Sequence, residues 1–153
     1  MLINLTRDKQ AIVDEQDYEY LNQWKWHFDG RYAARTKWMK ELQKEIKIYM
    51  HKEIFQAKIV DHINGNQLDN RRENLREVTG SQNNMNQTVQ KRKKHSKYKG
   101  VSWDKSRNKW IAYCKKDGKM YNLGRYESEL KAVLVYNQKA LELFGEFARL
   151  NKI

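Results

Sequence analysis

The chain has no proline and a single cysteine, Cys114, among its 153 residues. One cysteine excludes a disulfide framework within the chain and a zinc site built from several cysteines, and it fits a reducing cytoplasm. Without proline, the boundaries between segments must be marked by glycine, asparagine and runs of charge.

Long hydrophobic runs are also absent. Mean hydropathy is −1.04, and 33% of the residues are charged. No apolar stretch approaches the roughly 18 residues that a membrane span requires. Residues 1–10 contain no apolar region of the kind found in a signal peptide. We therefore expect one or two small domains, no contact with a membrane and a cytoplasmic location.

Positive charge is concentrated in the middle of the chain. The formal net charge is +12, and residues 88–125 hold 13 Lys and Arg against two Asp and Glu. A polyanion is the partner that such a segment favours, because each cation placed on a phosphate releases counterions. The alternative is a basic surface that only keeps the protein in solution.

Residues 1–50 predict several short strands and a helical turn near 17–23. Asp29-Gly30 favours a hairpin turn. Ile46, Ile48 and Met50 alternate, which predicts a half-buried strand that runs towards His51. Four aromatic residues are expected to anchor a small core; they are Trp24, Trp26, Tyr32 and Trp38.

Residues 61–84 contain six asparagines, an unusual number for a folded core. "KIVDH" predicts a strand that ends at Asp61 and His62, and a loop rich in Gly and Asn follows. "NLREVT" predicts a second strand, and "GSQNNMNQTVQ" begins a helix for which Thr79 or Ser81 is a suitable cap. If the helix packs across the hairpin, Asn83 in its first turns approaches the end of the first strand.

This segment favours metal-assisted chemistry on a phosphodiester. Oxygen atoms of Asp61 and Asn83 are hard ligands that suit Mg²⁺, with Mn²⁺ as a substitute, and they leave coordination positions for water and phosphate. His62, with an ordinary pKa of about 6.5, suits a general base that takes a proton from water. Asn74 would bond backbone across the loop and hold His62. The alternative is a structural loop with a surface histidine.

The segment "VDHINGNQLDNRRENLREVTGSQNNMNQ" resembles the HNH, or ββα-metal, nucleases. The likeness is to the phage and intron-encoded homing endonucleases, in which Asn fills the last metal position. It implies a metal-dependent DNA endonuclease with Asp61 and Asn83 as metal ligands, His62 as general base and Asn74 holding the loop. "YMHKEIF" fits the same branch, where a histidine commonly precedes the motif, so His51 is a further catalytic candidate.

The C-terminal part has its own pattern. "YKGVSWD", "KWIAYCK" and "KMYNLGRY" predict three antiparallel strands, and "ESELKAVLVYNQKALELFGEF" predicts a helix that Gly145 closes. The expected apolar positions of this helix are Leu130, Val133, Leu134, Leu141 and Phe144, with Ala132, Tyr136 and Ala140 beside them. The helix would cover one face of the sheet and leave a basic face, and a β-ribbon of this kind enters a major groove about 12 Å wide.

These C-terminal residues resemble the APETALA-two/ethylene-response-factor DNA-binding domain. The resemblance rests on Tyr98, Gly100-Val101, Trp110, Leu123-Gly124 and the alanine-containing helix. It implies that the module binds double-stranded DNA. The chain has Lys99 and Ser102 where the plant factors carry more arginine on the first strand.

Together these observations predict an α+β chain with two functional parts. We expect an HNH nuclease domain at residues 1–87 with a ββα-metal core at about 51–90, a basic linker at 88–97, and a three-stranded sheet packed on one helix at 98–153. The protein would be a site-specific homing endonuclease, encoded by a phage or mobile element and active in the cytoplasm of a bacterial host. It would act as a monomer on DNA, with a dimer as the other possibility.

The DNA contacts are expected from arginines near the motif, from the linker and from the sheet. They are Arg71, Arg72, Arg76, Lys91, Arg92, Lys93, Lys94, Lys99, Trp103, Lys105, Arg107, Lys109, Trp110, Lys115, Lys119, Tyr121 and Arg125. Strand alternation leaves open that Trp110 and Tyr121 face the core, and the three arginines near the motif are equally suited to a solvated surface. A DNA-binding regulator with an inactive nuclease half and a structural RNA-binding protein are the alternative functions.

Overall fold

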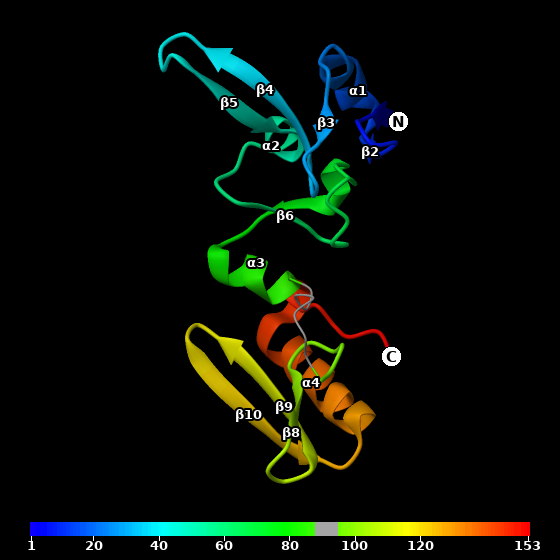
Figure 1. Ribbon diagram of the computed structural model, residues 1–153, viewed down its shortest axis with the longest axis vertical. Helices are drawn as coiled ribbons and strands as arrows, with labels where there is room; N and C mark the ends of the chain where they lie inside the picture. The colour runs from blue at the N-terminus through cyan, green and yellow to red at the C-terminus, as the bar shows by residue number, and fades with distance from the viewer. Residues whose placement is uncertain (88–94) are drawn as a thin grey trace. The chain divides into compact units, whose positions relative to one another are not determined.

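The computed structural model describes residues 1–87 and 95–153. The predicted DNA contacts Lys91, Arg92, Lys93 and Lys94 lie outside the described residues. The chain forms two compact units, Met1–Val78 and Thr79–Ile153, whose elements are labelled in Figure 1. None of the helices in the described parts of the chain is long and apolar enough to cross a membrane.

The first unit contains three small antiparallel sheets and two helices. The sheets are β1–β2, β3–β4–β5 and β6–β7. In chain order the elements are β1 Leu2–Asn4, β2 Gln10–Ile12, α1 Glu15–Asn22, β3 His27–Phe28, β4 Ala33–Met39, β5 Lys44–Tyr49, α2 Met50–Ile54, β6 Val60–His62, a 3₁₀ turn Arg72–Asn74 and β7 Leu75–Glu77. The predicted short strands and the helical turn are confirmed, although α1 begins two residues earlier than expected.

Two predictions for this unit are corrected. Trp26 is buried, and its Nε1 donates to the Leu21 carbonyl at 2.8 Å, but Trp24 and Trp38 are 41% and 53% exposed. Trp38 lies near the tip of the β4–β5 hairpin, away from the residues that pack around Met50. Met50 itself begins α2 instead of ending the strand, because β5 stops at Tyr49.

The predicted turn at Asp29-Gly30 is confirmed. Oδ1 of Asp29 accepts hydrogen bonds from the backbone N–H groups of Arg31 and Tyr32 at 3.0 and 2.9 Å. Gly30 has φ +103°, a conformation that side chains with a Cβ rarely adopt. The turn directs β4 back along β3 and places Tyr32 beside the histidines described below.

The second unit is a three-stranded antiparallel sheet with α4 across one face, as Figure 1 shows. Its elements are α3 Gly80–Asn86, β8 Val101–Asp104, β9 Lys109–Lys116, β10 Lys119–Tyr126, α4 Glu129–Phe144 and a 3₁₀ turn Gly145–Phe147. Asp117 and Gly118 both have positive φ, 48° and 81°, which suits the tight hairpin turn between β9 and β10. The predicted strands, their turns and the glycine at the end of α4 are confirmed.

The packing face of α4 differs from the prediction. Ala132, Val133, Tyr136, Ala140 and Phe144 are buried, with exposed fractions of 7% or less. The small side chains of the two alanines let the helix backbone lie close to the sheet. The apolar stripe is therefore rotated, and three leucines expected in the core are about half exposed on the flank; they are Leu130, Leu134 and Leu141.

Helix α3 belongs to the second unit. Met85 packs in the same core as Val101, Cys114 and Tyr136. Thr79 caps the helix as predicted, because its hydroxyl accepts from the N–H of Gln82 and the Gln82 side chain accepts from the Thr79 N–H. The two units therefore divide after Val78, about ten residues before the expected linker at 88–97.

We expect Gly100→Ala to destabilise the protein by about 3 kcal/mol, since Gly100 has φ +71° and a Cβ there would overlap the buried ring of Tyr136. Gly118→Ala is the matched control, because Gly118 also has positive φ but nothing lies within 4 Å of its Cβ position. We expect the control to lose only about 1 kcal/mol. Urea denaturation followed by circular dichroism measures both changes, and equal losses would contradict the packing at Gly100.

Candidate active site

The hairpin of β6 and β7 carries the predicted catalytic pair. The two strands are antiparallel, with Asp61 opposite Arg76 and His62 opposite Leu75. Asp61 and His62 are 7% and 4% exposed. Strand β6 ends at His62, so the chain turns into the loop directly after the histidine. Strand, loop, strand and helix follow one another along the chain as predicted.

The loop between the strands is held by its own side chains. Oδ1 of Asn74 accepts from the Asn64 N–H at 2.9 Å, and Nδ2 of Asn74 donates to the Asp69 carbonyl at 2.7 Å. The loop is also tied to β2, since the Asn70 N–H donates to the Ile12 carbonyl at 2.7 Å. The side chain of Asn74 thus bridges the loop backbone in the manner that the sequence suggested.

Asn70 is a site residue that the sequence did not single out. It is fully buried, and its Oδ1 lies 3.2 Å from Nε2 of His62. Its Nδ2 donates to the Leu68 carbonyl at 3.3 Å, which leaves the oxygen to face the imidazole. This arrangement favours the tautomer in which Nε2 of His62 carries the hydrogen and the lone pair of the neutral ring is on Nδ1. In the sequence, Asn70 is indistinguishable from the other asparagines of a turn-rich loop.

His51 lies against His62. Their ring centroids are 5.2 Å apart, and the ring of Tyr32 is 5.0 Å from that of His51. His51 is 6% exposed, and its Nδ1 has no hydrogen-bond partner among the residues that the structure describes. Helix α2 and strand β6 thus bring two histidines together that are 11 positions apart in the sequence.

Burial controls the protonation of this cluster. It lowers the pKa of His62 below the ordinary value, and it lowers the pKa of His51 to about 4, with the neighbouring His62 as the next cause. Burial raises the pKa of Tyr32. At neutral pH both imidazoles are therefore neutral, and a neutral imidazole is the form that accepts a proton.

Arg76 forms an ion pair across the hairpin. Its Nε and Nη2 donate to Oδ2 of Asp61 at 3.2 and 3.1 Å, and its side chain is only 13% exposed. A buried ion pair of this kind fixes the carboxylate beside His62. Arg76 was predicted to contact DNA; in the structure its guanidinium binds the carboxylate of Asp61.

The other two arginines near the motif also pair with carboxylates. Arg71 donates two hydrogen bonds to Asp69, at 2.9 and 2.8 Å, and holds the pKa of that carboxyl below its usual range. Arg72 donates two to Asp17, at 2.8 and 2.7 Å. Bidentate pairs are the stronger and more directional kind. Both arginines therefore brace the loop, and their contact with phosphate stays a prediction.

The residues present fit a divalent ion that keeps most of its shell for water and substrate. Asp61 offers a carboxylate, and Asn83 on α3 offers an amide oxygen, both of which suit Mg²⁺. Within residues 1–87 and 95–153, no group of three or more His, Cys, Asp or Glu gathers closely enough to hold an ion. The two oxygen donors of Asp61 and Asn83 differ from the four ligands of a closed structural zinc site. Asp61 belongs to the first unit and Asn83 to the second.

The aromatic residues predicted on the free face of the sheet lie on the other face. Trp110 and Tyr121 pack on the core beneath α4. Trp103 is directly opposite Trp110 in the register, and the two rings are 5.0 Å apart, so it shares that face. All three rings are partly exposed, and their contact with DNA stays a prediction. Strand alternation places Ile111 and Tyr113 on the free face instead.

Several predicted DNA-binding cations remain on the sheet and its turns. Lys105, Arg107, Lys115, Lys119 and Arg125 are exposed, and Lys109 is half-buried. Two of the arginines, Arg107 and Arg125, share the carboxylate of Asp104 at 3.5 and 3.0 Å.

Lys99 is different from these cations. Its Nζ donates to the carbonyl oxygens of Asn84, Met85 and Gln87, whereas the sequence predicted that it contacts DNA.

Known proteins resemble the part of the chain that holds this site. A family described as HNH endonuclease matches residues 53–85, from α2 to the last turn of α3. The chain is 40% identical over 94 residues to an uncharacterized HNH endonuclease of Acanthamoeba polyphaga mimivirus; this match covers 61% of the chain and 47% of the relative. It is 36% identical over 90 residues to Protein 3.8 of Escherichia phage T7, covering 59% of the chain and 73% of the relative.

The chain spans about half the length of the mimivirus relative and nearly three quarters of the phage relative. No solved structure matches it significantly. The family match covers the buried pair Asp61 and His62 and the loop that Asn70 and Asn74 hold. Since that match coincides with the site, the chain contains an HNH endonuclease domain at residues 53–85.

Proposed function

We propose that the protein is a site-specific DNA endonuclease of the homing type, which hydrolyses a phosphodiester bond with one divalent ion. The observation that carries this proposal is the state of His62. It is buried, its pKa is lowered by burial, and its Nε2 lies 3.2 Å from Oδ1 of Asn70, which favours the tautomer whose acceptor is Nδ1. A histidine held in one neutral tautomer beside a carboxylate is suited to activate water.

In the proposed reaction, Nδ1 of His62 removes a proton from a water molecule as its oxygen bonds to phosphorus. The ester bond opposite the attacking oxygen breaks, and the released oxygen takes up a proton to become a hydroxyl group. Bound Mg²⁺, or Mn²⁺ in its place, would supply charge stabilisation at the phosphate and the leaving oxygen. Asp61 and Asn83 would hold this ion, and Arg76 orients Asp61.

The second unit supplies DNA binding in this proposal. Residues 98–153 resemble the APETALA-two/ethylene-response-factor domain, and the sheet face opposite α4 carries Lys115 and Arg125 beside Ile111 and Tyr113. Double-stranded DNA is the proposed substrate. The protein acts as a monomer on a long asymmetric site, and a dimer would supply a second centre for the second strand.

The viral relatives support an origin in a phage or mobile element. The proposed location is therefore the cytoplasm of a bacterial host. The alternative function, a DNA-binding regulator with an inactive nuclease half, predicts binding without cleavage.

We expect His62→Ala and Asp61→Ala to lose cleavage of supercoiled plasmid carrying DNA from the gene's own neighbourhood. Loss of a general base costs about 10² to 10⁴ in rate. Both variants should still retard this DNA on a gel, and EDTA should abolish cleavage by the wild type. His27→Gln, a histidine outside the site, is the matched control. Retardation without cleavage by the wild type in either Mg²⁺ or Mn²⁺ would favour the regulator.

We expect Asn70→Leu to lower the cleavage rate about 10- to 100-fold, the range seen when an orienting partner is removed. The leucine has no acceptor for Nε2–H, so His62 would populate both neutral tautomers. Asn70→Asp keeps an acceptor and should keep the Nε2–H tautomer. Nitrogen NMR of the histidine rings separates the tautomers, and an unchanged His62 spectrum in Asn70→Leu would contradict the role of Asn70.

We expect Lys115→Ala to weaken DNA binding across sequences and to reduce the slope of log affinity against log salt by about one. Lys115 is exposed on the sheet face opposite α4. Lys131→Ala on α4 removes the same charge from the helix side and is the control. If both variants change the slope equally, the charge of the sheet face is not what DNA contacts.

A further inference from the structure

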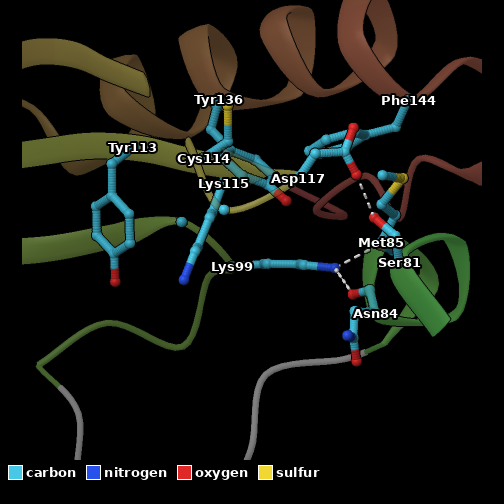
Figure 2. A pocket seen from close by; sticks show the side chains of 12 residues that line it. Ser81, Asn84, Met85, Lys99, Tyr113, Cys114, Lys115, Asp117, Tyr136 and Phe144 are labelled. Carbon is cyan, nitrogen blue, oxygen red and sulfur yellow. Dashed lines mark hydrogen bonds between the residues drawn. The ribbon is translucent and has the colours of Figure 1, made fainter. Parts of the chain in front are cut away.

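Helix α3 is fastened within the second unit at both ends, as Figure 2 shows. Near its start, the hydroxyl of Ser81 donates to Oδ1 of Asp117 at 2.8 Å. At its end, the ammonium group of Lys99 donates to the carbonyls of Asn84 at 3.3 Å, Gln87 at 2.8 Å and Met85. The last carbonyls of a helix have no partner within the helix, so Lys99 satisfies groups that would otherwise need water.

Lys99 is itself held in place by a chain of reciprocal hydrogen bonds. Its N–H donates to Oδ1 of Asn151 at 2.7 Å, and its carbonyl accepts from Nδ2 of Asn151 at 3.0 Å. The backbone of Asn151 is bound in the same two-way manner by the side chain of Asn137 on α4, at 2.8 and 2.9 Å. A continuous network therefore runs from α4 through the C-terminal tail and Lys99 to the end of α3.

The surroundings of Lys99 strengthen these bonds. Figure 2 shows its side chain reaching α3 along a pocket that Met85, Cys114, Tyr136 and Phe144 line on the apolar side. Burial there lowers the pKa of Lys99 to about 8. Hydrogen bonds in such an environment are stronger than at an exposed surface. A lysine kept for phosphate contact would instead hold its charge in water.

Asn83 lies on the same short helix, one residue before the first carbonyl that Lys99 holds. Any shift of the end of α3 is therefore transmitted directly to the backbone of Asn83. The contacts that fix this helix come from the sheet, from α4 and from the tail of the second unit. The position of Asn83 thus depends on the unit to which DNA binding is assigned.

We propose that Lys99 is a positioning residue: it fixes α3, and with it Asn83, to the sheet and α4 of the second unit. This inference rests on the proposed function, in which Asn83 holds the divalent ion. Lys99 acts through the α3 backbone and touches neither metal nor DNA. It is therefore distinct from the cations of the sheet face.

The first test is a metal titration of plasmid cleavage by the full chain. We expect Lys99→Met to raise the Mg²⁺ concentration for half-maximal cleavage roughly tenfold, as loss of a supporting contact does at metal sites. Lys99→Arg retains donors for the carbonyls and should recover most of the wild-type response. Lys131→Met, which removes a charge from the exposed side of α4, should match the wild type. An Mg²⁺ requirement unchanged in Lys99→Met would overturn the inference.

The second test needs no activity. Amide hydrogen exchange over residues 83–86, without added metal, should be roughly tenfold faster in Lys99→Met, while β9 and β10 exchange at the wild-type rate. Faster exchange with an unchanged Mg²⁺ requirement would make Lys99 a structural cap only and would overturn its role at the metal site. Unchanged exchange would show that Lys99 does not hold α3, even if cleavage by the wild type is intact.

The two tests separate failure of this inference from failure of the proposed function. If the wild type shows no metal-dependent cleavage, the proposed function fails, and the role of Lys99 at a metal site fails with it. If the wild type shows metal-dependent cleavage and Lys99→Met behaves as the wild type does, the inference alone is wrong.

Discussion

The hydrogen bond between His62 and Asn70 is the interaction on which the site depends. It favours one neutral tautomer of a buried imidazole, and this requires Asn70 to be buried and held in one orientation. The Ile12 carbonyl fixes its backbone, and the bridge that Asn74 makes across the loop fixes the neighbouring Asp69. The loop therefore needs its asparagines for fixed hydrogen-bond geometry more than for turn formation.

Positively charged side chains have different surroundings in the two units. In the first unit, the arginines nearest the site are paired with Asp61, Asp69 and Asp17, and they stabilise the hairpin and its loop. In the second unit, a cation such as Lys115 is exposed on the sheet. A guanidinium beside a carboxylate in a tight loop is held there by two directional hydrogen bonds, a role that proximity to the motif does not reveal.

Local patterns predicted most of the elements, and long-range contacts explain the errors. The order of strand, loop, strand and helix, the cap at Thr79 and the three C-terminal strands follow from residues close together in sequence. Alternation gives two faces to a strand without saying which is buried, so the sequence left open which face Trp110 occupies. Asn70 and Lys99 act through partners in β2 and at the end of α3, and composition alone carries no information about such pairs.

The division of the HNH motif between two folding units has a physical consequence. Its strands and loop pack in the first unit around Asp61 and His62, whereas α3 draws its apolar contact, its N-terminal tie and its C-terminal cap from the second unit. A helix of seven residues has little stability of its own, so these contacts determine whether it forms. The order of Asn83 is therefore coupled to the folding of the sheet and α4. A substitution in the core of the second unit, far from His62, will act on the helix that carries Asn83 before it acts on His62.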